Sequence, residues 1–268
     1  MEPIRVGSLT VQPVQDGIAI LEPTLFMVAD QPGDWTAHAD LLDPDGLLRV
    51  PVGVFVVRTG DVTVMLDAGV GPTDDPMFEG AALLTNLAAA GVRPDDIDVI
   101  VVSHLHADHM GWLSQHDVLT FPNATIRIGA DDWAYFVDQA GGGRRRARRL
   151  AAIEDHVELI DRDGTIVAPG ITTRATPGHT PGHISAVLSS DGERLIVMGD
   201  ALHCPAQLTE SEWQFMYDID RDLASRTRAE LLREADDPGT VLLPAHFPGM
   251  RATRLLPAQA GPRTWTMS

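Results

Sequence analysis

The feature that most constrains this chain is a β-branched run that leads directly into a dense histidine cluster, VIVVSHLHADH. The run predicts a buried strand over residues 98–103. Because side chains two positions apart point the same way in an extended segment, His104 and His106 can reach one metal ion together. Asp108 and His109 follow where the chain turns, so they can face a second ion close by. Imidazoles with a carboxylate suit Zn²⁺ or a similar divalent ion, whereas imidazoles buried without a partner would leave polar atoms unsatisfied.

The cluster cannot complete two metal sites alone, because each ion needs about four protein or water ligands. Candidate partners follow other predicted apolar strands. His179 lies in TPGHTPGH, Asp200 ends the strand RLIVMGD, and His246 follows the strand in TVLLPAHF. Layered α/β proteins place functional residues in the loops after the carboxyl ends of strands. We therefore expect these three side chains to complete a two-metal site with the cluster.

Short strands and helices make up the rest of the predicted fold. Strands are expected over residues 9–17, 52–60, 61–69, 171–176, 183–190, 194–200 and 240–246, and the second and third of these form a hairpin. Helices are expected over residues 81–91, with Gly91 ending the helix, and over 131–139 and 222–235. Strand pairs with interspersed helices indicate an α/β or α+β layered protein, and the length fits one domain over residues 1–268.

Composition argues against several classes of protein. The formal net charge of −18 disfavours nucleic acid as a partner, because an acidic chain repels phosphate backbones. No run of 18 apolar residues is present, so we expect no membrane span, and MEPIRVGSLTVQ lacks the pattern of a secretory signal. The single cysteine, Cys204, allows no internal disulfide and is interpreted as a small buried side chain. These features predict a cytoplasmic protein that acts on a small molecule.

Several motifs together resemble the metallo-β-lactamase superfamily: HLHADH, TPGHTPGH, the Gly-Asp pair before ALH, the late AHF and the early LDAG. The likeness spans roughly residues 50–250 and implies an αββα sandwich with the metals at one edge between the two sheets. It implies a first metal held by His104, His106 and His179, a second held by Asp108, His109 and His246, and Asp200 bridging both. Asp67 would orient a ligand imidazole, and His183 is interpreted either as lying behind the ligands or as structural.

The reaction that this resemblance implies is hydrolysis. A hydroxide shared by two divalent ions, expected to be Zn²⁺, would attack the substrate, and Asp108 would carry a proton to the leaving group. Asp200 stands where true β-lactamases have a cysteine, which argues against a dedicated β-lactamase. His203 stands where the best-known quorum-quenching lactonases have a tyrosine, and GDALHCPAQL looks more like the methyl-parathion-hydrolase-like branch. The expected substrate is a small, hydrophobic ester, lactone or phosphotriester.

Three other functions stay open at this point. One is an N-acyl-homoserine lactonase proper, and another is a mono-iron oxidoreductase similar to the persulfide dioxygenases of the same fold. The third is a non-catalytic protein that binds metal or a partner. The resemblance is also compatible with a homodimer.

Two segments, 24–46 and 201–220, are candidate substrate-pocket loops, because long loops in a compact domain are often functional. The candidate substrate-binding residues in these loops are Phe26, Trp35, His203, Trp213 and Phe215. If they line a pocket, the substrate is hydrophobic. The alternative is ordinary packing beneath the loops, or a surface position for His203. The arginine-rich stretch Arg144 to Arg149 is either a solvated helix start or a site for an anion or a partner protein.

Overall fold

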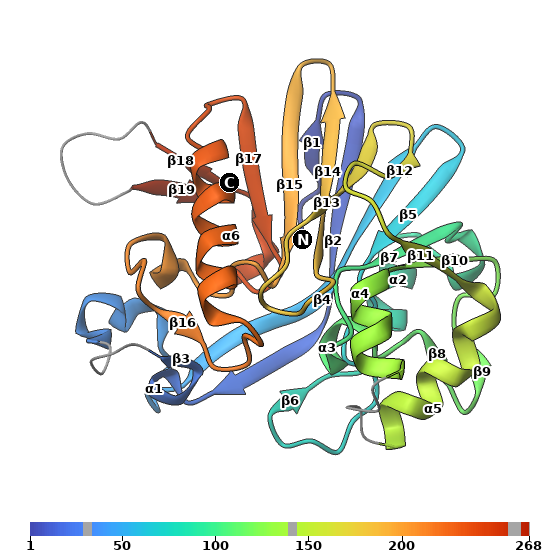
Figure 1. Ribbon diagram of the computed structural model, residues 1–268, viewed down its shortest axis with the longest axis horizontal. Coiled ribbons are helices and arrows are strands. Elements are labelled where there is room, and N and C mark those ends of the chain that lie inside the picture. The colour runs from blue at the N-terminus through green and yellow to red at the C-terminus, as the bar shows by residue number, and fades with distance from the viewer. Residues whose placement is uncertain (29–33, 139–143, 257–263, 268) are drawn as a thin grey trace.

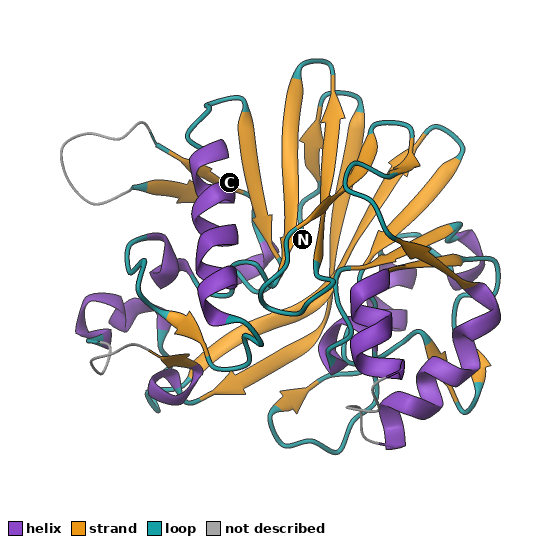
Figure 2. Cartoon of the chain, viewed as in Figure 1, coloured by secondary structure: helices purple, strands orange, loops and turns teal. Residues whose placement is uncertain are grey.

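Two β-sheets packed face to face lie at the centre of the computed structural model, which describes residues 1–28, 34–138, 144–256 and 264–267 (Figures 1 and 2). The first sheet runs in the order β1 (Ile4–Val6), β2 (Leu9–Leu21), β4 (Leu48–Thr59), β5 (Val62–Leu66), β7 (Val99–Val102), β10 (Thr125–Gly129) and β11 (Val157–Ile160), with β6 (Phe78–Glu79) on β2. The second sheet runs in the order β12 (Ile166–Ala168), β13 (Ile171–Ala175), β14 (Ile184–Ser190), β15 (Glu193–Gly199), β17 (Thr240–Pro244), β18 (Thr253–Leu255) and β19 (Trp265–Met267).

Smaller elements surround the two sheets. The pairs β3 (Met27–Val28) with β16 (Gln214–Phe215) and β8 (Ser114–Gln115) with β9 (Val118–Leu119) form two-stranded sheets. The helices are α1 (Pro23–Phe26), α2 (Leu83–Ala89), α3 (Ala107–Met110), α4 (Ala130–Trp133), α5 (Arg144–Ile153) and α6 (Arg221–Glu234). No helix in the described ranges is long and apolar enough to cross a membrane.

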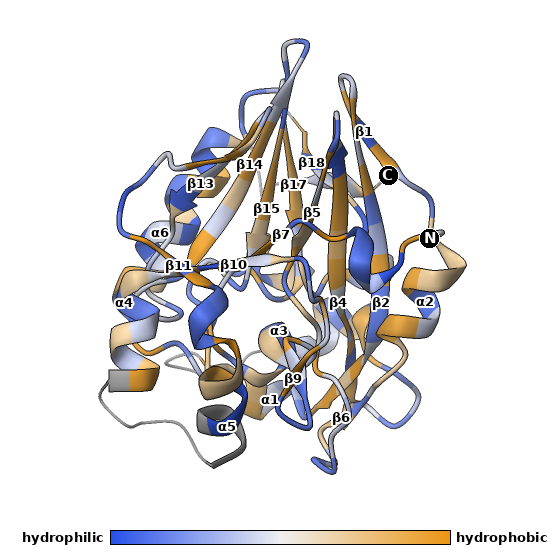
Figure 3. Ribbon diagram, turned by 90° about the vertical axis from the view of Figure 1, so that its right-hand side faces the viewer, coloured by the Kyte–Doolittle hydropathy of each residue, from blue (hydrophilic) through white to orange (hydrophobic). Residues whose placement is uncertain are grey.

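Both faces of each sheet carry apolar side chains, so each sheet has to be covered on both sides. Phe55 of the first sheet and Leu188 of the second belong to one buried cluster between the sheets. Leu87 of α2 packs on the outer face of the first sheet, and Leu231 of α6 packs on the outer face of the second. Figure 3 shows α2 and α6 on opposite sides of the stacked strands. The expected αββα architecture is therefore confirmed.

Most predicted elements appear with shifted ends. The hairpin is confirmed as β4 and β5, which pair antiparallel, and α2 is followed by Gly91 at φ +71°. The helix predicted over 131–139 appears as α4 followed directly by a π-helical turn over Ala134–Asp138, and residue 139 lies outside the described ranges. Residues 29–33 of the loop expected at 24–46 lie outside the described ranges, and its described part includes most of α1, β3 and a 3₁₀ turn over Trp35–Leu41.

A β-bulge at Asp16 explains why β2 continues past its predicted end at residue 17. The register with β4 shifts between Gln15 and Gly17, so Asp16 is the extra residue. Its carboxylate is fully buried and accepts four hydrogen bonds, from the backbone N–H groups of Val70, Gly71 and Leu83 and from the indole of Trp112, at 2.8–3.0 Å. Asp16 thereby fixes the loop after β5, which in turn contacts the turn that contains α3: the Ala68 N–H donates to the His109 carbonyl at 2.8 Å.

Replacing Asp16 with alanine is expected to lower the free energy of unfolding by at least about 3 kcal/mol, because it leaves four buried donors without an acceptor. Urea titration followed by circular dichroism measures this loss. Asp61→Asn, at an exposed position in the β4–β5 turn, is the matched control and should change stability by less than about 0.5 kcal/mol. Equal midpoints for the two variants would contradict the anchoring role of Asp16.

The arginine-rich stretch lies partly outside the described residues. Nothing is described for residues 139–143 or for the side chains of residues 144–147. Arg148, farther along α5, forms an ion pair with Asp117 across an exposed surface. Its guanidinium is therefore already paired with an acid of this chain.

Candidate metal centre

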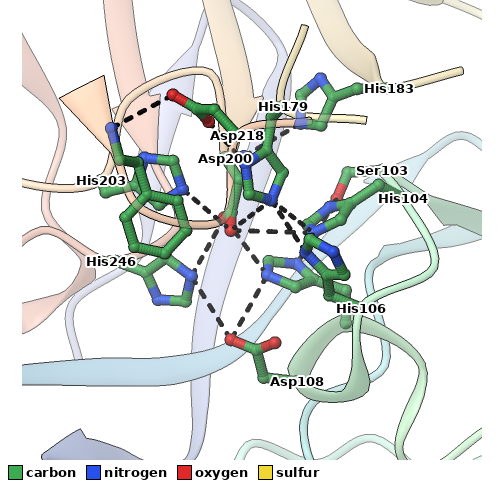
Figure 4. Close-up of polar contacts among 12 residues, drawn as sticks. Ser103, His104, His106, Asp108, His179, His183, Asp200, His203, Asp218 and His246 are labelled. Atoms are coloured by element: carbon green, nitrogen blue, oxygen red, sulfur yellow. Dashed lines mark hydrogen bonds and ion pairs between the residues drawn. The ribbon is translucent and has the colours of Figure 1, made fainter. Parts of the chain in front are cut away.

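Strands of both sheets end at one edge of the sandwich, and their following loops carry the predicted metal ligands. His104 and His106 follow β7, and His179 follows β13. The Nε2 atom of His179 lies 3.1 Å from Nε2 of His104 and 2.9 Å from Nδ1 of His106, and the latter two atoms are 2.9 Å apart (Figure 4). Three imidazole nitrogens thus converge on one point.

A second group lies beside the first. Asp108 and His109 lie on α3, and His246 follows β17. An Oδ2 atom of Asp108 lies 3.6 Å from Nε2 of His109 and 3.6 Å from Nε2 of His246. Asp200, directly after β15, separates the two groups: Oδ1 lies 3.0 Å from His246 and 3.2 Å from His109, while Oδ2 lies 3.4 Å from Nε2 of His179. One carboxylate therefore faces both groups.

These separations fit two divalent ions. A tetrahedral ion with ligands at about 2.0–2.1 Å places neighbouring ligand atoms about 3.3 Å apart. The observed spacings of 2.9–3.7 Å bracket that value. Nε2 of His109 and Oδ1 of Asp200 are buried without a hydrogen-bond partner, which an ion would supply. His104, His106, His179 and Asp200 would hold one ion, and Asp108, His109 and His246, with Asp200, the other.

The outer ring nitrogens of the ligand histidines have acceptors that fix their orientation. The Nδ1–H of His109 donates to Asp67 at 2.9 Å, and the Nδ1–H of His246 donates to the Pro51 carbonyl at 2.8 Å. Ser103 Oγ lies 3.0 Å from Nδ1 of His104 and donates to Asp67 at 3.1 Å. Each bond turns the Nε2 lone pair inward, which is how outer partners prepare imidazoles for a metal.

Burial keeps the first group of histidines neutral. It lowers the pKa of His104 and His179 well below the usual range and lowers the pKa of His106 to about 3, and the neighbouring imidazoles act in the same direction. Neutral imidazoles are the form that binds metal. The first group is therefore in its binding form at physiological pH.

The second group is dominated by negative charge. Burial opposes the charged forms of His109 and His246, but the nearby carboxylates, Asp200 foremost, outweigh it and raise both pKa values. Burial would likewise raise the pKa of Asp200, but the surrounding histidines, His109 first, hold it well below its usual range. The Asp200 carboxylate is thus negatively charged and favours positive charge in both groups of side chains.

His183 contacts the backbone of Asp200. The Asp200 N–H donates to Nε2 of His183 at 3.0 Å, so the other ring nitrogen, Nδ1, carries the proton and donates to Thr176 Oγ1 at 2.8 Å. Burial lowers the pKa of His183 to about 4, which keeps the ring neutral. Gly199 precedes Asp200 at φ +54°, where a Cβ would lie 2.7 Å from this Nε2. The Gly-Asp pair therefore reflects close packing of His183 against the turn.

A cavity of about 290 Å³ opens onto the ligands. Its apolar wall is formed by Ala19, Leu21, Phe26, Val50, Met77 and Phe78, and Phe215 and Tyr217 line it as well. The polar residues that line it are Asp75, His106, Asp108, Asp200, His203 and His246. His203 is fully buried, with Nε2 3.2 Å from Oδ2 of Asp200 and its ring 3.7 Å from that of Phe215. A surface position for His203 is therefore excluded.

Two of the five candidate substrate-binding residues lie elsewhere. Trp35 and Trp213 do not line the cavity, because they pack against each other at 4.8 Å between ring centroids, within the apolar cluster beneath the loops. A role of these two residues in substrate binding stays a prediction. Phe26, His203 and Phe215 do line the cavity.

The two candidate pocket loops are joined to each other. Met27 pairs with Phe215 between β3 and β16, and the Met216 N–H donates to the Phe26 carbonyl at 3.0 Å. Sequence reasoning missed Tyr217, which lines the cavity, and Asp218, whose carboxylate accepts from Nδ1 of His179 at 2.9 Å. Both lie in MYDIDRD, a stretch that resembles the methyl-parathion-hydrolase-like branch but that gave neither residue a role.

Cys204 follows His203 in the sequence but does not line the cavity. It is buried, and burial raises the pKa of its thiol to about 12. It is therefore the small buried side chain that was expected.

Known proteins are similar to this chain in sequence and in fold. The family model for the metallo-beta-lactamase superfamily matches residues 48–246. An N-acyl homoserine lactonase from Bacillus cereus is 26% identical over 175 residues, which are 59% of this chain and 66% of that enzyme. The lactonase AttM from Azorhizobium caulinodans is 33% identical over 122 residues, 41% of this chain and 42% of that one. This chain thus spans just under two thirds of the Bacillus enzyme.

Solved structures share the fold over almost the whole chain. AidC, described as a dizinc quorum-quenching lactonase in complex with a product, superposes with a TM-score of 0.85 at 24% identity, covering 99% of this chain and 96% of that one. The hydrolase AbOPH, described as belonging to the beta lactamase superfamily, has a TM-score of 0.81 at 24% identity, with 98% and 95% covered.

Proposed function

The chain belongs to the metallo-β-lactamase superfamily, and on that basis we propose that it is a dinuclear metal-dependent hydrolase whose best substrates are small, apolar lactones. N-acyl homoserine lactones fall within this class, and the relatives from Bacillus and Azorhizobium carry that name. The observation that carries the proposal is the position of the ligand cluster. Four of the seven candidate ligands, His106, Asp108, Asp200 and His246, line a cavity whose other lining side chains are mostly apolar.

The chemistry divides between the ions and the side chains. Two divalent ions bound here would polarise the substrate carbonyl and lower the pKa of a water molecule toward about 7. Asp108 faces the cavity and is only 17% exposed, so its carboxylate can take up a proton and deliver it to the leaving alkoxide oxygen. His203 supplies a ring N–H at the cavity wall that can orient the carbonyl oxygen.

The apolar wall accounts for the substrate class. Phe26, Phe215 and Tyr217 line the cavity together with strand residues such as Leu21 and Val50. A lactone ring at the ligands would leave its substituent against this wall, where burial of CH₂ groups contributes about 0.8 kcal/mol each. Small esters and phosphotriesters fit the same chemistry, and they are the second class to be tested.

The mono-iron alternative is less consistent with the geometry. A single iron would use His104, His106, His179 or an equivalent set, and would leave Asp108, His109 and His246 without a role. These three side chains converge within 4.8 Å and include a buried nitrogen without a hydrogen-bond partner. The second group therefore favours two ions.

Hydrolysis of N-acyl homoserine lactones of increasing chain length tests the substrate class. The zinc-loaded protein is expected to open the lactone ring, and each added CH₂ should lower KM by up to about 4-fold until the apolar wall is covered. Release of one proton per turnover, measured in weakly buffered solution with a pH indicator, reports the rate.

The control substrates are the matching open-chain amides, which carry the same acyl group and no lactone ring. Protein shown to contain two zinc ions that turns over no lactone, aryl ester or phosphotriester would refute the proposed function. Turnover of lactones with a KM independent of chain length would refute the role of the apolar wall alone.

A further inference from the structure

Asp218 contacts the first group of candidate ligands, the rest of its own loop (residues 201–220, called the cavity loop) and α6. Its side chain has no exposed surface. Oδ1 accepts from Nδ1 of His179 at 2.9 Å, and Oδ2 accepts from the backbone N–H of Phe215 at 3.2 Å. The guanidinium of Arg228, which is 3% exposed, lies 3.6 Å from the same Oδ2. A metal-ligand imidazole and a cavity-lining backbone thus share one buried carboxylate (Figure 4).

Arg228 donates hydrogen bonds to two further backbone carbonyls of the cavity loop. Its Nε donates to the carbonyl of Ala201, next to the bridging Asp200, at 3.2 Å, and Nη1 donates to the carbonyl of Trp213 at 3.1 Å. The loop is also tied to the segment that carries His179, because the Ile219 N–H donates to the His179 carbonyl at 3.1 Å. The buried cation and the buried carboxylate therefore hold the loop between α6 and the ligands.

We propose that Asp218 is a positioning residue that both fixes His179 in its metal-binding tautomer and holds the cavity loop at Phe215, with Arg228 as its buried counter-charge. The inference rests on the metal centre of the proposed function and is independent of the lactone substrate.

Only a carboxylate satisfies this position. His179 Nδ1–H, Phe215 N–H and the Arg228 guanidinium are all donors, and a carboxylate offers about four acceptor sites. An asparagine amide of the same shape offers one oxygen and one NH₂. Its oxygen is expected to face the Phe215 N–H and the charged Arg228 guanidinium, so its NH₂ faces the Nδ1–H of His179, donor against donor. The isosteric change therefore removes the acceptor of His179 without removing volume.

The proposal predicts that Asp218→Asn weakens zinc binding by about 10–100-fold, the usual effect of losing a partner of a ligand imidazole. Competition against a chromophoric chelator, with the purified protein and zinc alone, measures this affinity. At saturating zinc, KM for a hydrolysed substrate should change by less than about 2-fold in Asp218→Asn, because the amide oxygen still accepts from the Phe215 N–H, whereas Asp218→Ala, which removes both acceptors, should raise KM by about 10-fold.

Asp220→Asn is the matched control. Asp220 lies two residues away in the same loop, but its side chain is exposed and caps α6 by accepting from the Leu223 N–H at 2.9 Å, which asparagine also does. This variant should bind zinc and substrate as the unaltered protein does. A folded Asp218→Asn variant with unchanged zinc affinity would overturn the proposal.

A measurement on the unaltered protein covers the case in which Asp218→Asn does not fold. ¹⁵N NMR of the metal-free chain should show His179 as the Nδ1–H tautomer with a downfield, hydrogen-bonded proton, assigned by its loss in His179→Gln. An Nε2–H tautomer at His179 would overturn the role of Asp218. If the unaltered protein binds no zinc at all, the metal centre itself fails, and the two outcomes are distinguishable.

Discussion

Asp200→Asn is expected to reduce bound zinc from two ions to about one per chain and to lower kcat/KM for lactone hydrolysis by at least about 10³-fold. The reason is the position of the two carboxylate oxygens. Oδ1 lies 3.0 Å from His246 and Oδ2 lies 3.4 Å from His179, so each oxygen serves a different ligand group. An asparagine keeps one oxygen and presents an NH₂ to the other group, and an NH₂ cannot coordinate a cation.

The fold should survive this substitution, because asparagine has the same shape and the backbone N–H at position 200 still donates to His183. Inductively coupled plasma mass spectrometry gives the zinc content, and lactone kinetics give the rate. Asp191→Asn is the control: Asp191 lies at the far turn of the β14–β15 hairpin at φ +53°, a conformation that asparagine also tolerates. Two zinc ions and near-normal activity in Asp200→Asn would refute a bridging role.

The convergence of the candidate ligands could be predicted from the sequence because these residues carry local signals. His104 and His106 follow an apolar strand, and His179, Asp200 and His246 each follow another. Strand ends in a layered fold converge at one edge, so a rule about strand ends brings together residues that are 142 positions apart, from 104 to 246. The structure places these side chains within hydrogen-bonding distance or slightly beyond.

Asp67, which accepts from His109, was predicted from its motif, whereas Asp218 behind His179 was not. Asp218 lies in a loop of irregular structure, and its contact with His179 depends on how β16 pairs with β3. Asp16 lies inside a strand. An aspartate followed by glycine ordinarily indicates a turn, so the sequence predicts the end of the strand where the structure has a bulge. The positions of the aromatic side chains in the loops could not be predicted either, because periodicity does not say whether Trp35 or Phe26 faces the cavity.

Removal of metal is expected to destabilise the folded protein as well as abolish its activity. The ligand cluster brings buried imidazole and carboxylate atoms to within 2.9–3.7 Å of one another, an arrangement that bound cations would stabilise. An ion at 1,000 times its Kd stabilises the folded state by about 4 kcal/mol. For a chain of this length, that corresponds to a fall in Tm of roughly 8–16 °C for each ion removed.

Differential scanning calorimetry before and after treatment with a chelator, with metal content measured on both samples, gives this shift. Restoring zinc should return both Tm and lactone hydrolysis, which separates loss of metal from irreversible unfolding. Asp200→Asn provides an internal comparison: because its carboxylate no longer joins the two groups, its Tm should respond to the chelator by about half as much. A metal-free sample with unchanged Tm would mean that the inward-facing nitrogens of His104, His109 and His246 are satisfied without a cation, and the metal centre would have to be abandoned.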